Sequence, residues 1–166
     1  MIRSVMLAVA LLSGCTPKRV PAPAERPDRS AVAVGEAISL ERTACFGGCP
    51  VYRIMVTPAG AVTYEGRANV RRIGGATAEI SPDSVAALLR EMEQAGYFTF
   101  SERYAVSEPT CRYYTTDSPT AISSATFRGR TRRIEHDYGC GGVPGALTVL
   151  ERRIDEVLGA DRWTGR

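Results

Sequence analysis

The sequence predicts an α+β domain, an antiparallel sheet of about five strands built from two hairpin–helix units, with two helices packed on one face. Runs of alternating apolar residues occur in pairs around turn signals, and each pair precedes a segment in which apolar residues recur at helical spacing. The 166 residues suffice for one domain, and a hydrophobic content of 44% with 23% charged residues is typical of a globular protein.

The first hairpin–helix unit begins near residue 37. Residues 37–43 (AISLERT) alternate weakly between apolar and polar and are expected to form a strand. The runs at 51–57 (VYRIMVT) and 61–67 (AVTYEGR) flank the turn signal at 58–60 (PAG), so they predict a hairpin. The glycine pair at 74–75 is expected to break the chain after it. Apolar side chains of one parity are expected on the core face of this hairpin: Tyr52, Ile54, Val56, Val62 and Tyr64.

Residues 81–96 (SPDSVAALLREMEQAG) predict the first helix. Ser81 is a favourable N-cap, Pro82 fits the first helical position, and Gly96 can take the left-handed conformation that ends a helix. The apolar stripe that would pack on the sheet consists of Val85, Leu88, Leu89 and Met92.

The second unit repeats this order. Residues 120–127 (TAISSATF) and 131–138 (TRRIEHDY) flank Arg128-Gly129-Arg130 and predict another hairpin. A helix is expected from about Gly145 to its stop at Gly159. Its apolar stripe consists of Leu147, Leu150, Ile154, Val157 and Leu158. The acidic residues of both helices are expected on the polar faces, and Asp117 and Asp137 are expected to serve turns and surface charge.

The N-terminus predicts an exported, lipid-anchored protein. A positive Arg3 and an apolar run at 5–12 form a leader that is too short to cross a membrane as a helix. The leader ends in LSGC (12–15), which resembles the lipobox of bacterial lipoproteins. The resemblance implies that residues 1–14 are a signal peptide and that Cys15 carries fatty acyl chains (palmitate), which anchor the chain in a membrane.

Residues 15–36 follow as the lipidated N-terminus and a tether with four prolines, which leaves residues 37–166 as a single domain. Thr16 stands where lipoproteins retained in the inner membrane generally carry Asp, so the expected location is the periplasmic face of the outer membrane. The net charge of +3 is too small to indicate binding to nucleic acid.

Four cysteines remain once Cys15 is assigned to the anchor. An even number of cysteines in an exported chain predicts disulfides, and three pairings are possible. Cys45–Cys49 is favoured because the glycines between the two residues allow a tight loop. Cys111–Cys140 is favoured because the two residues bracket the second hairpin.

Three reactive interpretations of the cysteines compete with disulfides. The C-x3-C spacing before a strand is unlike a thioredoxin-type redox centre, which needs C-x-x-C at the start of a helix. Cys45, Cys49, Cys140 and His136 have a ligand count suited to structural zinc. Cys140 or Cys49 could also act as a nucleophile with His136, the only histidine, as its base. No cofactor, metal or catalytic set is expected.

The strings CFGGCPVYRIMVTPAGAVTYEG (45–66), TDSPT, HDYGCGG and LERRIDEVLGADRW resemble a bacterial family catalogued as domain of unknown function 6438 (DUF6438), over roughly residues 37 to 165. The most specific part is C-x-G-x-C-P-x-Y, which falls here on Cys45, Gly47, Cys49, Pro50 and Tyr52. The resemblance implies an exported or lipid-anchored protein and carries no established activity.

Two hypotheses of different classes remain. The first is a non-catalytic cell-envelope lipoprotein, stapled by disulfides, that binds an envelope protein or ligand through the free sheet face or loops. The second is an envelope enzyme that uses a thiol, or a zinc-binding domain, with Cys45, Cys49 or Cys140 and His136. A count of free thiols discriminates between them.

Overall fold

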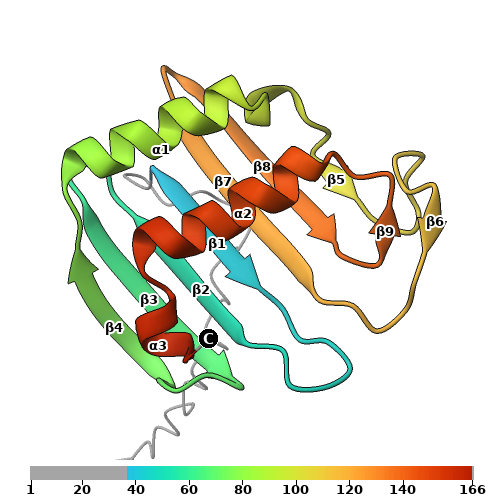
Figure 1. Cartoon of the computed structure of the whole chain (residues 1–166), viewed down its shortest axis with the longest axis horizontal. Helices are drawn as coiled ribbons and strands as arrows, with labels where there is room; N and C mark the ends of the chain where they lie inside the picture. The colour runs from blue at the N-terminus through green and yellow to red at the C-terminus, as the bar shows by residue number, and fades with distance from the viewer. Residues whose placement is uncertain (1–36, 166) are drawn as a thin grey trace, which may run out of the picture. The chain divides into compact units, whose positions relative to one another are not determined.

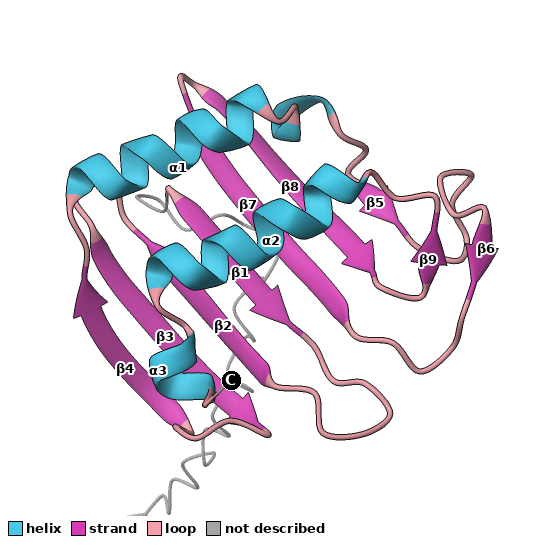
Figure 2. Ribbon diagram, in the orientation of Figure 1, coloured by secondary structure: helices cyan, strands magenta, loops and turns pink. Residues whose placement is uncertain are grey.

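Residues 37–165 are described by the computed structural model. The signal peptide, Cys15 and the tether fall outside the described residues. The elements form one large sheet, one two-stranded sheet and a layer of helices (Figures 1 and 2). The large sheet has the order β4-β3-β2-β1-β7-β8-β5. Its strands are β1 (Ile38–Arg42), β2 (Val51–Val56), β3 (Ala61–Ala68), β4 (Gly74–Glu79), β5 (Arg103–Tyr104), β7 (Thr120–Phe127) and β8 (Arg130–Asp137).

The strand β1 lies at the centre and joins the two predicted hairpins into one sheet. It pairs antiparallel with β2 on one side and with β7 on the other, and Leu40 is opposite both Ile54 and Ser123. Both hairpins and the first strand are therefore confirmed. The turn between β2 and β3 requires Gly60, because its φ is +91° and a Cβ atom there would lie 2.0 Å from the carbonyl oxygen of Ile80.

The expected five-stranded antiparallel sheet is wrong in detail. The sheet has seven strands and is mixed, because β5 runs parallel to β8, with Arg103 opposite Glu135. The glycine pair at 74–75 does not break the chain: it starts the edge strand β4, and Gly74 pairs with Gly66 of β3. A second small sheet pairs β6 (Tyr113–Tyr114) with β9 (Cys140–Gly141).

The helices α1 (Pro82–Gln94) and α2 (Gly145–Leu158) lie on the same face of the large sheet (Figure 2). The Ser81 side chain accepts a hydrogen bond of 3.1 Å from the backbone N–H of Ser84, which confirms the predicted N-cap. Gly159 ends α2 with a φ of 67° and is followed by the short helix α3 (Asp161–Thr164). Between α1 and β5 the chain forms a 3-10 turn, η1 (Tyr97–Thr99).

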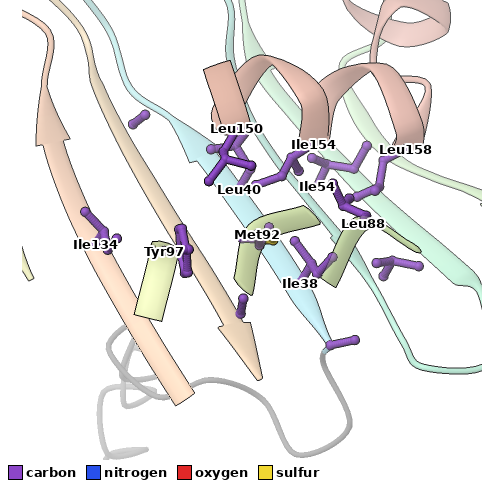
Figure 3. Close-up of a cluster of buried hydrophobic side chains, with 14 of the residues drawn as sticks. Ile38, Leu40, Ile54, Leu88, Met92, Tyr97, Ile134, Leu150, Ile154 and Leu158 are labelled. Carbon is purple, nitrogen blue, oxygen red and sulfur yellow. The ribbon is translucent and has the colours of Figure 1, made fainter. Parts of the chain in front are cut away.

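The core lies between this face of the sheet and the two helices. Figure 3 shows Leu40 and Ile54 beneath the α2 residues Leu150, Ile154 and Leu158. These five side chains are all at most 1% exposed. From α1, Leu88 and Met92 are buried in the same cluster, so the predicted stripes of both helices face the sheet.

Aromatic rings position α3 at one side of the sheet. The ring of Tyr64 on β3 stacks on Tyr52 of β2 and on Trp163 of α3, with centroid distances of 5.7 and 4.8 Å. The backbone N–H of Arg72 also donates a 2.9 Å hydrogen bond to the carbonyl of Trp163. Within residues 37–165, no helix has both the length and the apolar character needed to cross a membrane.

Candidate functional site

A network of paired polar side chains lies between α2 and the sheet, at the end of β1. Arg42, the last residue of β1, bonds the Asp155 carboxylate of α2 through Nε at 2.9 Å and Nη2 at 2.7 Å. Its Nη1 donates to the Tyr138 hydroxyl at 3.2 Å, and Nη2 also reaches the Glu151 carbonyl at 3.3 Å. The side chains of Arg42 and Asp155 are only 16% and 22% exposed, so the ion pair is largely removed from water.

Tyr52 completes the first half of the network. Its hydroxyl donates a 2.6 Å hydrogen bond to Asp155 Oδ1 and accepts one of 3.1 Å from Arg42 Nε. Tyr52 faces the helices because it shares the parity of Ile54, as the alternation of β2 requires. This tyrosine of the C-x-G-x-C-P-x-Y motif therefore links the first hairpin to α2.

Glu151 and His136 form the second half of the network. Glu151 is fully buried, accepts a 2.7 Å hydrogen bond from the Tyr138 hydroxyl, and has both carboxylate oxygens within 3.0 and 3.1 Å of His136 Nδ1. An ionised carboxylate only accepts, so Nδ1 carries a proton in that state. The rings of His136 and Tyr138 stack with their centroids 4.4 Å apart.

Burial is the largest single influence on the pKa of each titratable group described next. Burial and the Glu151 charge raise the pKa of Tyr138 to about 12, despite the opposing effect of Arg42. Burial and Asp155 likewise raise the pKa of Tyr52. Burial by itself would lower the pKa of Arg42, but Asp155 and the two phenol oxygens outweigh that effect and raise it. For Asp155, burial raises the pKa against the opposing pull of Arg42 and Tyr52.

A groove runs beside α2, and we call it the α2 groove. It consists of two cavities, of about 420 and 410 Å³, that share Arg42 and Pro50. The first cavity is also lined by Tyr52, Asp155, Glu156, Ala160, Asp161 and Thr164. The second is also lined by Cys49, Pro119, Tyr138, Thr148 and Arg152. The α2 residues of the second cavity precede those of the first, so the groove follows the axis of the helix.

The loop between β1 and β2 forms one rim of the α2 groove. A disulfide joins Cys45 and Cys49, whose Cα atoms are 5.7 Å apart, and Gly47 takes a φ of 131°. The Asn69 side chain donates a 3.0 Å hydrogen bond to the carbonyl of Cys49. Phe46, at the tip of this closed loop, is 87% exposed, and its N–H is bonded to the carbonyl of Asp117 at 3.1 Å.

The cysteine pairing favoured from the sequence is present in the structure. Cys111 is joined to Cys140 of β9, with their Cα atoms 5.1 Å apart, and Cys45 to Cys49. All four cysteines of the described residues are therefore in disulfides. His136 is bonded to Glu151 rather than grouped with the cysteines, and residues 37–165 contain no cluster of three or more His, Cys, Asp or Glu suited to a metal.

The sequence does not predict most of this network of polar side chains between α2 and the sheet. The expectation that helix carboxylates lie on polar faces is wrong for Glu151 and for the largely buried Asp155. A signal was present, because Glu151 follows Leu147 by one turn and precedes Ile154 by three residues, which places it inside the apolar stripe. For Asp137, the expected turn role is confirmed by a 2.9 Å hydrogen bond from the Gly139 N–H.

Comparison with known proteins identifies the family. The family described as a domain of unknown function (DUF6438) matches residues 36–158, which is most of the chain. The chain therefore belongs to this family, as the motif at residues 45–52 indicated. A search of the curated proteins finds no match.

Proposed function

We propose that this member of the DUF6438 family is a lipoprotein of the cell envelope, anchored through Cys15, whose domain binds an envelope protein or ligand without catalysing a reaction. The α2 groove is its binding site. The observation that carries this proposal is the position of the family motif, since Cys49, Pro50 and Tyr52 all line the groove. The presence of three motif residues at one concave surface supports a role in binding in addition to stapling the loop.

The protonation of the groove supports binding rather than catalysis. A tyrosine whose pKa is raised to about 12 stays protonated at neutral pH, so the Tyr138 hydroxyl is a hydrogen-bond donor and is not available as a general base. Arg42 already uses all three of its nitrogens in the network. These side chains are held in one arrangement by their hydrogen bonds. A ligand that contacts them would therefore bind with little loss of side-chain entropy.

Site-specific photo-crosslinking in living cells tests the binding site. A photoreactive amino acid in place of Thr148, inside the second cavity, is expected to capture an envelope component upon irradiation. The matched control places the same amino acid at Arg90, an exposed position on α1. Equal capture from both positions, or none from Thr148, would contradict the proposal.

Metabolic labelling with a fatty acid tests the anchor. The wild-type chain is expected to incorporate the label and to fractionate with membranes. The Cys15→Ser variant is expected to remain unlabelled and soluble, because the thioether to the lipid can form only on the cysteine sulfur. Labelling that persists in Cys15→Ser would place the anchor elsewhere.

The alternative, a thiol enzyme or a zinc domain built on Cys45, Cys49, Cys140 and His136, requires reduced cysteines. We expect no free thiols in the denatured, unreduced mature protein, because Cys15 is alkylated by lipid and the other four cysteines are paired. Two or four free thiols per chain would favour the alternative over the binding domain.

A further inference from the structure

Two charged side chains of the α2 groove have no partner among the residues that the structure describes. Arg152 lines the second cavity and Asp161 lines the first, and both residues are exposed. Within residues 37–165, neither side chain has an ion pair or a hydrogen bond. The two cavities of the groove therefore carry opposite charges that no described residue pairs with.

The other charges of the groove cancel. Arg42, which lines both cavities, is paired with Asp155, as shown above. Glu156, which lines the first cavity, is bonded to Arg153 at 3.1 Å. What remains is one cationic group in the second cavity and one anionic group in the first.

The helix itself supports the same polarity. The second cavity contacts the first turn of α2 through Thr148, and the first cavity contacts its last turn through Asp155 and Glu156. The positive end of a helix dipole favours an anion and the negative end favours a cation. The dipole and the two unpaired side chains therefore select the same orientation of a ligand.

The dimensions of the groove limit the ligand. Arg152 lies six residues before Leu158, the end of α2, which corresponds to about 9 Å along the helix axis, and Asp161 follows as the first residue of α3. An extended peptide rises roughly 3.3 Å per residue, so about three residues cover this length and a fourth extends toward Asp161. Pro50, Pro119 and the Cys45–Cys49 disulfide provide apolar walls near the cationic end.

We propose that the α2 groove binds a short extended peptide of about four residues with both termini free. Its terminal carboxylate pairs with Arg152 and its terminal ammonium group pairs with Asp161. An apolar C-terminal side chain packs between Pro50 and Pro119. This inference rests on the proposed binding function and specifies the ligand class of that same groove.

Calorimetric titration of the mature, lipidated protein in detergent tests the inference. The probe is an alanine tetrapeptide that ends in leucine, used with free termini, as the N-acetylated form and as the C-terminal amide. The wild-type protein is expected to bind the unmodified peptide and to lose about tenfold in affinity for each modified form, the size of one charge-assisted contact.

Two variants assign the termini. Arg152→Gln is expected to bind the unmodified peptide about tenfold more weakly than the wild-type protein does. It should bind the C-terminal amide with the same affinity as the unmodified peptide, because the contact with the carboxylate is already lost. Asp161→Asn is expected to lose the discrimination against the acetylated form in the same way. Arg90→Gln and Asp83→Asn, which remove exposed charges of α1, are the matched controls and are expected to behave as wild type.

Several results would overturn the inference. Absence of saturable binding to the wild-type protein excludes the peptide, and a penalty for amidation that survives in Arg152→Gln excludes the assigned carboxylate site. A penalty for acetylation that survives in Asp161→Asn excludes the ammonium site. If the tetrapeptide fails while Thr148 still captures an envelope component in cells, the binding function stands and only the peptide is wrong. If both fail, both proposals fall.

Discussion

At the scale of single residues, Arg42 connects the sheet to α2. Its guanidinium group contacts Asp155, Tyr52 and Tyr138, which come from three different elements or their ends. An arginine suits this place because its donors are fixed in a plane and its charge persists when buried. Breaking a buried pair is costly chiefly because the partner charge stays behind without compensation.

We therefore predict that Arg42→Met lowers the free energy of unfolding by about 3 kcal/mol, because it leaves the Asp155 carboxylate unpaired. Urea denaturation of both proteins measures the loss. The exposed Arg90→Met serves as the control and should change the stability by less than about 0.5 kcal/mol. The double variant Arg42→Met with Asp155→Leu should recover part of the loss. A double variant less stable than Arg42→Met alone would contradict this account.

Tyr138 should make the protein sensitive to alkali. Its pKa is about 12 in the folded protein and 10.0 in the unfolded chain, so between these values the folded state holds the proton more tightly. Stability from this group is fully present below pH 10.0 and is lost as the pH rises through about 12. We predict that Tyr138→Phe loses less stability than wild type between these two pH values, measured by denaturation at each pH. If the free energies of unfolding of Tyr138→Phe and wild type fell equally with pH over this range, Tyr138 would not be the source of the sensitivity.

At the scale of elements, local patterns predicted the parts whose signal is local. Both helices, both hairpins and the central strand have caps, turns or alternation within a few residues of sequence. The edge strand β4 is not expected from the sequence because its glycine pair suggests a break and its alternation rests only on the small side chains of Ala76 and Ala78. The two-residue strands β5, β6 and β9 are too short to have a period at all.

The candidate site was less predictable than the fold. The C-x-G-x-C-P-x-Y motif is visible in the sequence, but alternation by itself predicts only that Tyr52 lies on the core face of a strand. Its partner Asp155 is 103 residues away in sequence, and no local rule relates them. Glu151 lies inside an apolar stripe, and that anomaly was the single local sign of a buried polar network.

The two disulfides should contribute differently to stability and to binding. Cys111 and Cys140 are 29 residues apart, whereas Cys45 and Cys49 are four apart. In the chain-entropy model these loops contribute roughly 3.5 and 2 kcal/mol. We predict that replacing the first pair by alanine costs more stability, measured by urea denaturation. Replacing the second pair should reduce capture from Thr148 more strongly, because Cys49 lines the groove. If the same pair of replacements had the larger effect on both stability and capture from Thr148, the prediction would be wrong.

At the scale of the whole molecule, the described residues share one hydrophobic core. The buried cluster runs from Ala37 to Trp163 and joins both hairpins, α1, α2 and α3. The strand β1 holds the two halves of the sheet together, although it begins at the second described residue. The core of the described residues therefore includes the first of them, Ala37 and Ile38.

We predict that a chain of residues 36–166 has the same free energy of unfolding as the Cys15→Ser mature chain, within about 0.5 kcal/mol. Most of the removed segment is rich in proline and alternating charge, a composition that favours a tether over a packed core. Urea denaturation of both chains measures the difference. A chain that begins at Thr43 is the contrasting control and should not fold, because it lacks Ile38 and Leu40 at the centre of the sheet. If the 36–166 chain lost more than about 1 kcal/mol, the N-terminal segment would belong to the folded domain, and its role as a tether would have to be abandoned.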